Sequence, residues 1–352
     1  MSGGVDSSVA AWLMRESGFD CEGATMVLYP EADGSHIRDA CDAARRIGIP
    51  FHVCDFSETF DELVISRFTS EYIRGATPNP CIDCNRHIKF GCFLEHALSS
   101  GFDMIATGHY AQISRVNDRY QLCKGADPQK DQSYMLYTLT QEKLSRIALP
   151  LGGITKSDVR EIAAAQCFAS AGSKESQDIC FIPDGDYYRF IESRLSESGL
   201  RDSGPGVNLC EATLPGPGRF IDAGGRDLGM HKGIHHYTIG QRRGLGISSP
   251  HSLYVCDIDP VKNTVTLGSN DNLYTKELFV RDINLIAAEK FDSPIRLSVK
   301  IRYRQSEQPA TVWQQEAGVL RIEFDRPQRA VTKGQAAVLY DGNTVVGGGT
   351  IY

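Results

Sequence analysis

The segment SGGVDSS at residues 2–8 constrains the fold of this chain more than any other. Two adjacent glycines let backbone N–H groups approach an anion closely, and the serine hydroxyls add further donors. The apolar pattern that follows predicts a helix whose positive end points at the same place. A turn of this kind normally joins a buried strand to a helix. Because no apolar stretch precedes residue 2, we expect the first strand of the sheet to be missing, which would leave neighbouring strands with unpaired backbone groups.

Composition narrows the class of protein. The 352 residues suffice for two or three domains, and 41% of them are hydrophobic. The formal net charge of −7 means that a nucleic-acid partner requires a local basic face. The 11 cysteines are scattered and odd in number, and we find neither an apolar signal segment nor a run long enough to cross a membrane. These features predict a cytoplasmic protein that does not contact a membrane.

Three regions of the chain differ in their sequence pattern. Residues 1–202 alternate short apolar runs with helical patterns, which predicts a doubly wound parallel α/β sheet. Residues 203–272 start with a stretch rich in glycine and proline and are predicted to form a small β-rich linking domain. Residues 273–352 consist of short strand patterns separated by turn residues, as in a small β-barrel.

The loop at residues 2–8 is not a Walker loop, because no Gly-Lys-Ser/Thr follows it. It closely resembles the PP-loop of ATP pyrophosphatases. Members of that superfamily fold as a doubly wound sheet, cleave ATP between the α- and β-phosphates, and transfer AMP to a carbonyl oxygen. The alternative is a glycine-rich turn without a ligand. The density of the SGGxDSS pattern favours the nucleotide interpretation.

A second motif, TPNPCIDCNRHIKF at residues 77–90, carries two cysteines. Its prolines predict an extended loop, and a helix starting after Asn85 would place Cys84 near a positive helix end. Together with the basic side chains nearby, that position lowers the pKa of a thiol and favours the nucleophilic thiolate. Cys81, Cys84 and His87 are also spaced like zinc ligands, but the chain has no second CxxC pair to complete a zinc knuckle.

A third cysteine lies in QDICFI at residues 177–182, and by itself it would be interpreted as a buried thiol. Together with the two motifs above, the chain resembles the family of MnmA-type tRNA-specific 2-thiouridylases. Further matching stretches follow in order along the chain: ATGHYA (106–111), KDQSYMLYTL (130–139), HYTIGQRRGLGI (236–247), KIRYRQ (300–305) and TKGQAAVLYDG (332–342).

The resemblance implies an ATP-consuming sulfurtransferase that converts the wobble uridine of tRNA, position 34, to 2-thiouridine, with AMP and diphosphate as products. AMP activates the C2 carbonyl, and a carrier protein delivers sulfur as a persulfide on Cys180. Cys84 then releases the sulfur and leaves a Cys84–Cys180 disulfide, which requires a mobile loop around Cys180. ATP with Mg²⁺ is implied to lie on Ser2, Gly3, Gly4, Asp6, Ser7, Ser8, Met26 and Gly108.

The resemblance also implies that the enzyme is a monomer whose substrates are the tRNAs for Lys, Glu and Gln. The implied tRNA contacts come from three motifs and the last barrel: Asn79, Pro80, Cys81, His109, Lys130, Asp131, Gln132, Arg302, Tyr303 and Gln335. For the KIRYR stretch the alternative is an ordinary strand with a charged outward face.

Cys81 departs from many members of the family, which have aspartate after Asn-Pro. If the loop is extended, Asp83 lies on the same side as Cys81 and could take over the role of that aspartate. Alternatively, Cys81, Cys84 and Cys180 could hold an iron–sulfur cluster that carries the sulfur. We favour the persulfide route, because it needs only two of the thiols. A PP-loop synthetase acting on a small metabolite, or an RNA-binding protein without catalysis, would need neither Cys84 nor Cys180.

Overall fold

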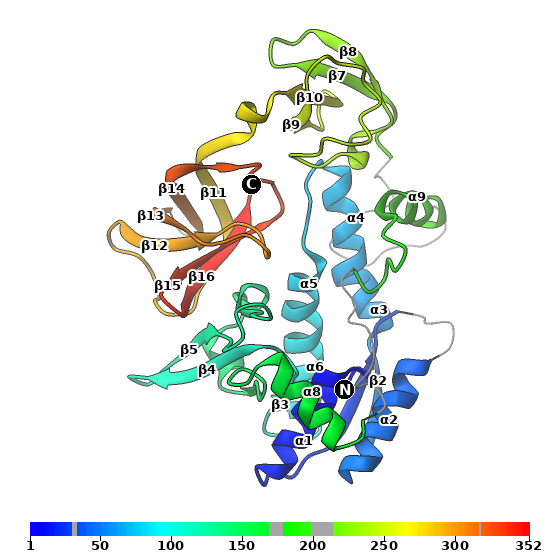
Figure 1. The fold of residues 1–352 in the computed structure, drawn as a ribbon, viewed down its shortest axis with the longest axis vertical. Helices are drawn as coiled ribbons and strands as arrows, with labels where there is room; N and C mark the ends of the chain where they lie inside the picture. Colours follow the sequence, from blue (N-terminus) through cyan, green and yellow to red (C-terminus); the bar gives the residue numbers. More distant parts are fainter. Residues whose placement is uncertain (30–33, 169–178, 199–213, 317) are drawn as a thin grey trace.

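The computed structural model describes residues 1–29, 34–168, 179–198, 214–316 and 318–352. Figure 1 shows an N-terminal α/β region, a small β module and a C-terminal barrel. The helical segments of the first region are α1 (Val5–Glu16), α2 (Ser35–Ile47), α3 (Ser57–Phe60), η1 (Asp61–Ile65), α4 (Ser66–Ile73), α5 (Pro80–Asp83), η2 (Cys84–Cys92), α6 (Phe93–Ser99), η3 (Ser133–Leu136), α7 (Gln141–Leu144), α8 (Lys156–Ala165) and α9 (Tyr187–Ser198). Its strands are β1 (Gly23–Val27), β2 (Phe51–Asp55), β3 (Ile105–Ala106), β4 (Ala111–Val116), β5 (Arg119–Lys124) and β6 (Ile147–Ala148).

The strand pairing near the N-terminus is parallel, as the alternating pattern predicts. β1 pairs with β2 from Gly23↔Phe51 onward, and β3 pairs with β6. Residues 1–4 form no strand, and the two parallel pairs are separate ladders within the described residues. Met1 nevertheless lies along β1, since its amino group donates to the Ala24 carbonyl and its carbonyl accepts from the Thr25 hydroxyl.

The middle of the chain forms a four-stranded sheet in the order β8-β7-β10-β9. Its elements are β7 (Gly218–Asp222), β8 (Asp227–His231), η6 (Ile234–His236), β9 (Tyr254–Asp259), β10 (Thr264–Gly268) and η7 (Asn270–Leu273). Phe220, Val255 and Leu267 are buried in its own small core, to which Ile234 and Tyr237 also belong. The boundary predicted at residue 203 falls in 199–213, outside the described residues.

The C-terminal strands close into a six-stranded barrel, because β11 pairs with both β14 and β16. They are β11 (Tyr274–Leu285), β12 (Ile295–Lys300), β13 (Gln308–Glu316), β14 (Val319–Arg329), β15 (Ala336–Asp341) and β16 (Thr344–Ile351). The predicted strand through KIRYR is wrong in its second half. β12 ends at Lys300, and a turn follows in which the Gln305 N–H donates to the Arg302 carbonyl.

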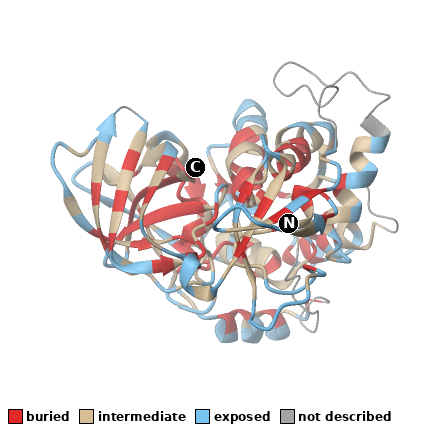
Figure 2. Ribbon diagram, turned by 90° about the horizontal axis from the view of Figure 1, so that it is seen from above, coloured by how far each residue is buried: buried red, intermediate tan, exposed pale blue. Residues whose placement is uncertain are grey.

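The barrel and the N-terminal region share one apolar core. β5 extends the barrel sheet by pairing with β16, and Leu122 of β5 packs in the same cluster as Tyr340 and Val345. Figure 2 shows this continuity as buried residues that run through the barrel strands and the inner helices. Such packing holds the barrel in a defined position beside α5 and η2. Within the described residues, no helix is both long and apolar enough to cross a membrane.

Candidate active site

The loop before α1 forms an open cradle for an anion. Gly3 has a φ of +73°, and Gly4 caps the helix without a side-chain hydrogen bond. The Ser7 and Ser8 hydroxyls each donate to the Gly4 carbonyl at 3.1 Å, and the Ser2 N–H donates to the Ser7 Oγ at 2.9 Å. These bonds hold the loop in shape, and Val5, Asp6 and Ser7 of the first turn of α1 line the cavity, as expected of an anion site at a helix N-terminus.

Gly108 packs directly beneath this loop. A Cβ at position 108 would lie 2.8 Å from the Asp6 carbonyl carbon and 3.0 Å from the Ser7 nitrogen, so only glycine allows the contact. Met26 of β1 lines the same cavity. Ser2, Gly4, Asp6, Ser7, Met26 and Gly108 therefore line one cavity, whereas Gly3 and Ser8 are not among its lining residues and Ser8 is buried.

Asp6 is held by two side chains that the sequence patterns did not reveal. Its Oδ1 accepts a hydrogen bond from the Tyr110 hydroxyl and one from Lys156 Nζ, both at 2.6 Å. Lys156 is the first residue of α8, whose start is fixed by the Thr155–Asp158 capping box, and it is buried. A single lysine at a helix start carries no sequence signal for a site, because its partner is 150 residues away in the chain.

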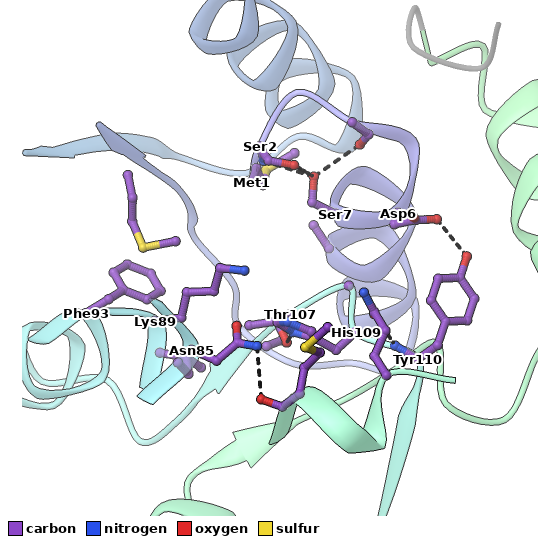
Figure 3. A pocket seen from close by; sticks show the side chains of 18 of the residues that line it. Met1, Ser2, Asp6, Ser7, Asn85, Lys89, Phe93, Thr107, His109 and Tyr110 are labelled. Carbon is purple, nitrogen blue, oxygen red and sulfur yellow. Dashed lines mark hydrogen bonds between the residues drawn. The ribbon is translucent and has the colours of Figure 1, made fainter. Parts of the chain in front are cut away.

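A cavity of about 2100 Å³ joins this loop to the cysteines. Cys81 and Cys180 line it, as do Asn85 and Lys89. Figure 3 shows Lys89 extending from η2 into the space between the Ser2–Ser7 loop and the wall formed by Asn85 and His109. Asn85 Nδ2 donates to the Met135 carbonyl at 3.3 Å, whereas its buried Oδ1 has no hydrogen-bond partner and can accept one from a ligand.

The helix that carries Cys84 begins earlier than predicted. α5 starts at Pro80, and the Asn79 side chain caps it by accepting from the Cys81 N–H at 3.2 Å. Cys84 therefore lies one turn inside the helix, with 8% of its surface exposed. Burial raises its pKa, the opposite of the predicted lowering, because loss of water outweighs the favourable charge of Lys89.

Cys180 is exposed to the cavity, and the residues after it anchor it in the core. Phe181 and Ile182 pack in one apolar cluster with Cys84, so the residues after Cys180 and the Cys84 side chain belong to the same core. Burial, with smaller contributions from the nearby Cys84 and Cys81, raises the pKa of Cys180 to about 11. A mobile loop is predicted around Cys180, and residues 169–178, which precede this cysteine, lie outside the described residues.

The charge of Lys89 affects the pKa of all three thiols. Its charge lowers the pKa of Cys81, Cys84 and Cys180, against the larger opposing effect of burial in each case. It shares its motif with the cysteines, but only the fold aims it into the cavity. Among the described residues, Cys81, Cys84 and His87 do not bring three ligand atoms within 4.8 Å of one another, so the geometry does not favour the zinc alternative.

Asp83 does not stand in for an aspartate at position 81. Because residues 80–83 are helical, Cys81 and Asp83 point to different sides of the turn, and the prediction from an extended loop is wrong. Asp83 is buried, with Oδ2 3.5 Å from the Arg67 Nε. Burial raises its pKa to about 6, and Arg67 offsets only part of that effect.

Several residues predicted to contact tRNA line the cavity, namely Asn79, Cys81, His109, Lys130, Asp131, Gln132 and Tyr303. Asp131 also caps the turn before η3, with Oδ1 accepting from the Gly125 and Ser133 N–H groups. Gln132 Oε1 accepts from the Tyr110 N–H at 3.0 Å. Burial lowers the pKa of His109 well below its ordinary value, so that ring is neutral at pH 7.

Pro80, Arg302 and Gln335 are not among the residues that line the cavity. Arg302 donates to the Ala330 carbonyl at 2.6 Å and to the Thr332 hydroxyl at 2.8 Å. Gln335 Nε2 donates to the Thr77 carbonyl at 2.7 Å, which ties the barrel to the segment that leads into α5. In this structure Gln335 therefore supports the position of the barrel, whereas Arg302 holds a turn within the barrel region.

Comparison with known proteins identifies the family. Residues 1–184 match the model for a tRNA methyl transferase HUP domain, residues 208–269 its PRC-barrel domain, and residues 275–351 an aminomethyltransferase β-barrel domain. A tRNA-specific 2-thiouridylase MnmA from Clostridioides difficile is 44% identical, over 100% of this chain and 96% of the relative. One from Acetivibrio thermocellus is 45% identical over 100% and 97%.

The chain belongs to the MnmA family. A relative from Clostridium botulinum, named tRNA-specific 2-thiouridylase MnmA 1, is also 44% identical over the whole of this chain. The methyltransferase wording of the family models does not agree with these names, all of which describe thiolation. The HUP, PRC-barrel and β-barrel matches along this chain follow the same order as the three regions of the fold in Figure 1.

Proposed function

We propose that this chain is an ATP-consuming tRNA 2-thiouridylase, a sulfurtransferase that replaces the C2 oxygen of the wobble uridine with sulfur. The observation that carries the proposal is that one cavity is lined both by the phosphate-binding loop and by Cys81 and Cys180. A synthetase for a small metabolite would need the loop but no pair of thiols beside it. We further propose that residues 1–202 carry the chemistry, residues 203–272 link, and residues 273–352 contact tRNA.

ATP is the first substrate in this proposal. Ser2, Gly3, Gly4, Asp6, Ser7 and Ser8 hold its phosphates, Met26 lies near the adenine, and Gly108 closes the site. The tight contact of Gly108 with Asp6 and Ser7 supports this assignment, because such a cradle leaves backbone groups free for phosphate oxygens. Mg²⁺ would screen the phosphate charge, and since Asp6 already accepts from Lys156, phosphate oxygens would supply most of its ligands.

AMP transfer to O2 of the uridine turns that oxygen into a leaving group, with diphosphate released. The terminal sulfur of a Cys180 persulfide, delivered by a carrier protein, then attacks C2 and expels AMP. The Cys84 thiolate next attacks the Cys180 sulfur, which breaks the S–S bond, leaves sulfur on C2 and forms a Cys84–Cys180 disulfide. An external dithiol restores both thiols and accounts for the two electrons.

The burial of Cys84 adds a condition to this sequence. Because Cys84 is buried and Phe181 and Ile182 pack in its apolar cluster, we propose that the Cys180 segment moves before Cys84 attacks. Lys89 supports the thiolate form of both cysteines once they meet. The proposed tRNA contacts are Asn79, Pro80, Cys81, His109, Lys130, Asp131, Gln132, Arg302, Tyr303 and Gln335, on the tRNAs for Lys, Glu and Gln.

The test is a reconstituted reaction with unmodified tRNA transcript, ATP and a persulfide-loaded carrier, followed by nucleoside mass spectrometry and measurement of AMP. We expect 2-thiouridine and tRNA-dependent AMP, and loss of 2-thiouridine in Cys84→Ser and Cys180→Ser with ATP binding retained. Thiolation by either variant would contradict the two-cysteine route. If AMP forms without tRNA and both variants remain active, the small-metabolite synthetase is the correct assignment. If activity instead follows the iron content of the protein, the iron–sulfur cluster route is the correct assignment.

A further inference from the structure

Helix α9 meets the β7–β10 module at a cluster of three side chains remote from the cavity, Glu192, His235 and His236. His236 Nε2 lies 3.1 Å from Glu192 Oε1, and His235 Nε2 lies 3.6 Å from the same oxygen. One ligand atom from each residue lies within 4.8 Å of the others, and no other trio of metal-binding side chains does so in the described parts of the chain. We propose that these three residues form a binding site for a divalent cation of the zinc class.

The spacing fits the coordination shell of zinc. Zn²⁺ binds His nitrogen and carboxylate oxygen at about 2.0–2.1 Å in a tetrahedron, which places neighbouring ligand atoms about 3.3 Å apart. The two measured separations, 3.1 and 3.6 Å, lie on either side of that value. Two histidines and one carboxylate are a common zinc ligand set, with water as the fourth ligand. The side chain of Glu192 is 46% exposed, so water can reach the fourth position.

The state of His235 is the second observation that points to a ligand. Only 3% of this residue is exposed, and neither ring nitrogen has a hydrogen-bond partner. Buried imidazole nitrogens normally have a partner. A Cβ at Gly233 would lie 2.6 Å from Cε1 and 2.9 Å from Nδ1 of this ring, and Nε2 is the nitrogen that lies near Glu192.

The cluster is also well placed to stiffen the structure. The ring of Tyr188 lies 4.9 Å from that of His236, which fixes the second histidine from the α9 side. Ile191 of α9 packs in the apolar cluster that contains Phe181 and Ile182, the residues that follow Cys180. A cation at this site would therefore join the β module to the helix that anchors the Cys180 segment. The inference does not depend on the proposed function.

Cobalt provides a direct test, because tetrahedral Co²⁺ absorbs visible light and thiolate ligands add a charge-transfer band that nitrogen and oxygen ligands lack. The protein carrying Cys81→Ala, Cys84→Ala and Cys180→Ala is titrated with CoCl2 and then with ZnCl2. We expect one tetrahedral Co²⁺ without the thiolate band, displaced by Zn²⁺. In the same background, Glu192→Gln and His236→Asn should each weaken binding by at least about 10-fold. His251→Asn, a change at an exposed histidine, should not.

Thermal unfolding with and without ZnCl2 gives a second readout. Zinc should raise the Tm of the parent protein and of His251→Asn but not that of Glu192→Gln. Because Glu192 lies on the exposed face of α9, its replacement by glutamine keeps the fold and decides the question even if His236→Asn unfolds. Absence of a tetrahedral Co²⁺ spectrum in the parent, or its retention in Glu192→Gln, would overturn the proposal.

Discussion

Lys156 Nζ donates a 2.6 Å hydrogen bond to Asp6 Oδ1, joining the first turn of α8 to the first turn of α1 across 150 residues of sequence. The lysine side chain is 9% exposed and that of Asp6 35%. The pair places a buried positive charge directly beside the loop that we propose binds phosphate. It also fixes the position of the Asp6 carboxylate in the first turn of α1, the helix that follows this loop.

Replacing Lys156 should therefore affect both stability and nucleotide use. Lys156→Met leaves Asp6 without its cation, and because Asp6 is partly exposed we expect a loss of about 2 kcal/mol in the free energy of unfolding, less than for a fully buried pair. Urea unfolding measures it, and the KM for ATP should rise. Asp6→Asn added to Lys156→Met should recover part of the stability; strictly additive losses would show that the two side chains do not interact.

Lys89→Met should slow alkylation of Cys180. Lys89 lowers the pKa of this thiol, so its removal raises a pKa already near 11 and reduces the thiolate fraction at pH 8. We expect iodoacetamide to react about threefold to tenfold more slowly, the effect of up to one pKa unit. Mass spectrometry of the Cys180 peptide gives the rate. Lys143→Met is the control, since Lys143 acts on His87 and is not among the charges that shift the pKa of Cys180; equal slowing by both variants would contradict the assignment.

Gly108→Ala should displace the phosphate-binding loop. The new Cβ would meet backbone atoms of Asp6 and Ser7 at 2.8–3.0 Å, and backbone cannot move aside as a side chain end can. We expect a loss of about 1–3 kcal/mol in unfolding free energy and weaker ATP binding by calorimetry. Gly153→Ala, where a Cβ meets nothing within 4 Å, should preserve both. Normal ATP affinity in Gly108→Ala would argue against Gly108 closing the site.

The stability of Asp83→Asn relative to the parent protein should increase as pH rises. Burial raises the pKa of Asp83 from 3.8 to about 6, so the folded protein holds this proton more tightly than the unfolded chain. That stabilisation is complete below about pH 4 and is lost as pH rises through about 6. Relative to the parent, the variant should therefore gain up to about 3 kcal/mol between pH 4 and pH 7 by urea unfolding. Asp103→Asn, at an exposed carboxylate, provides the comparison; parallel pH profiles for the parent and Asp83→Asn would refute it.

Salt dependence can separate a phosphate contact from a structural arginine. Lys130 lines the cavity, and Lys130→Ala should weaken tRNA binding and lower the slope of log K against log salt by about 1. Arg302→Ala should weaken binding too, but mainly by loosening the Ala330–Thr332 turn, with a smaller change in slope and a lower Tm. If Arg302→Ala left the Tm unchanged and lowered the slope as much as Lys130→Ala does, Arg302 would be a direct phosphate contact, as the sequence resemblance implies.

Local patterns predicted most elements correctly where side-chain periodicity and turn residues were clear. The helix after SGGVDSS, the parallel pairing of β1 with β2 and the run of short C-terminal strands are confirmed. The helix start at Pro80 was missed, although Asn-Pro is a helix-start signal, because two prolines suggested an extended loop. The end of β12 at Lys300 was missed because KIRYR alternates like a strand.

The sequence by itself determined the family of this protein and the residue types of its site, since the phosphate-binding loop and the cysteine motifs are each short and contiguous. Only the tertiary structure decided which groups meet. Lys156 finds Asp6, Arg67 finds Asp83, and Glu192 finds His235 and His236 through contacts between distant segments. It also decided the state of Cys84, whose thiol has a raised and not a lowered pKa. The physical reason is that desolvation depends on everything packed around a group, whereas a motif describes only its neighbours along the chain.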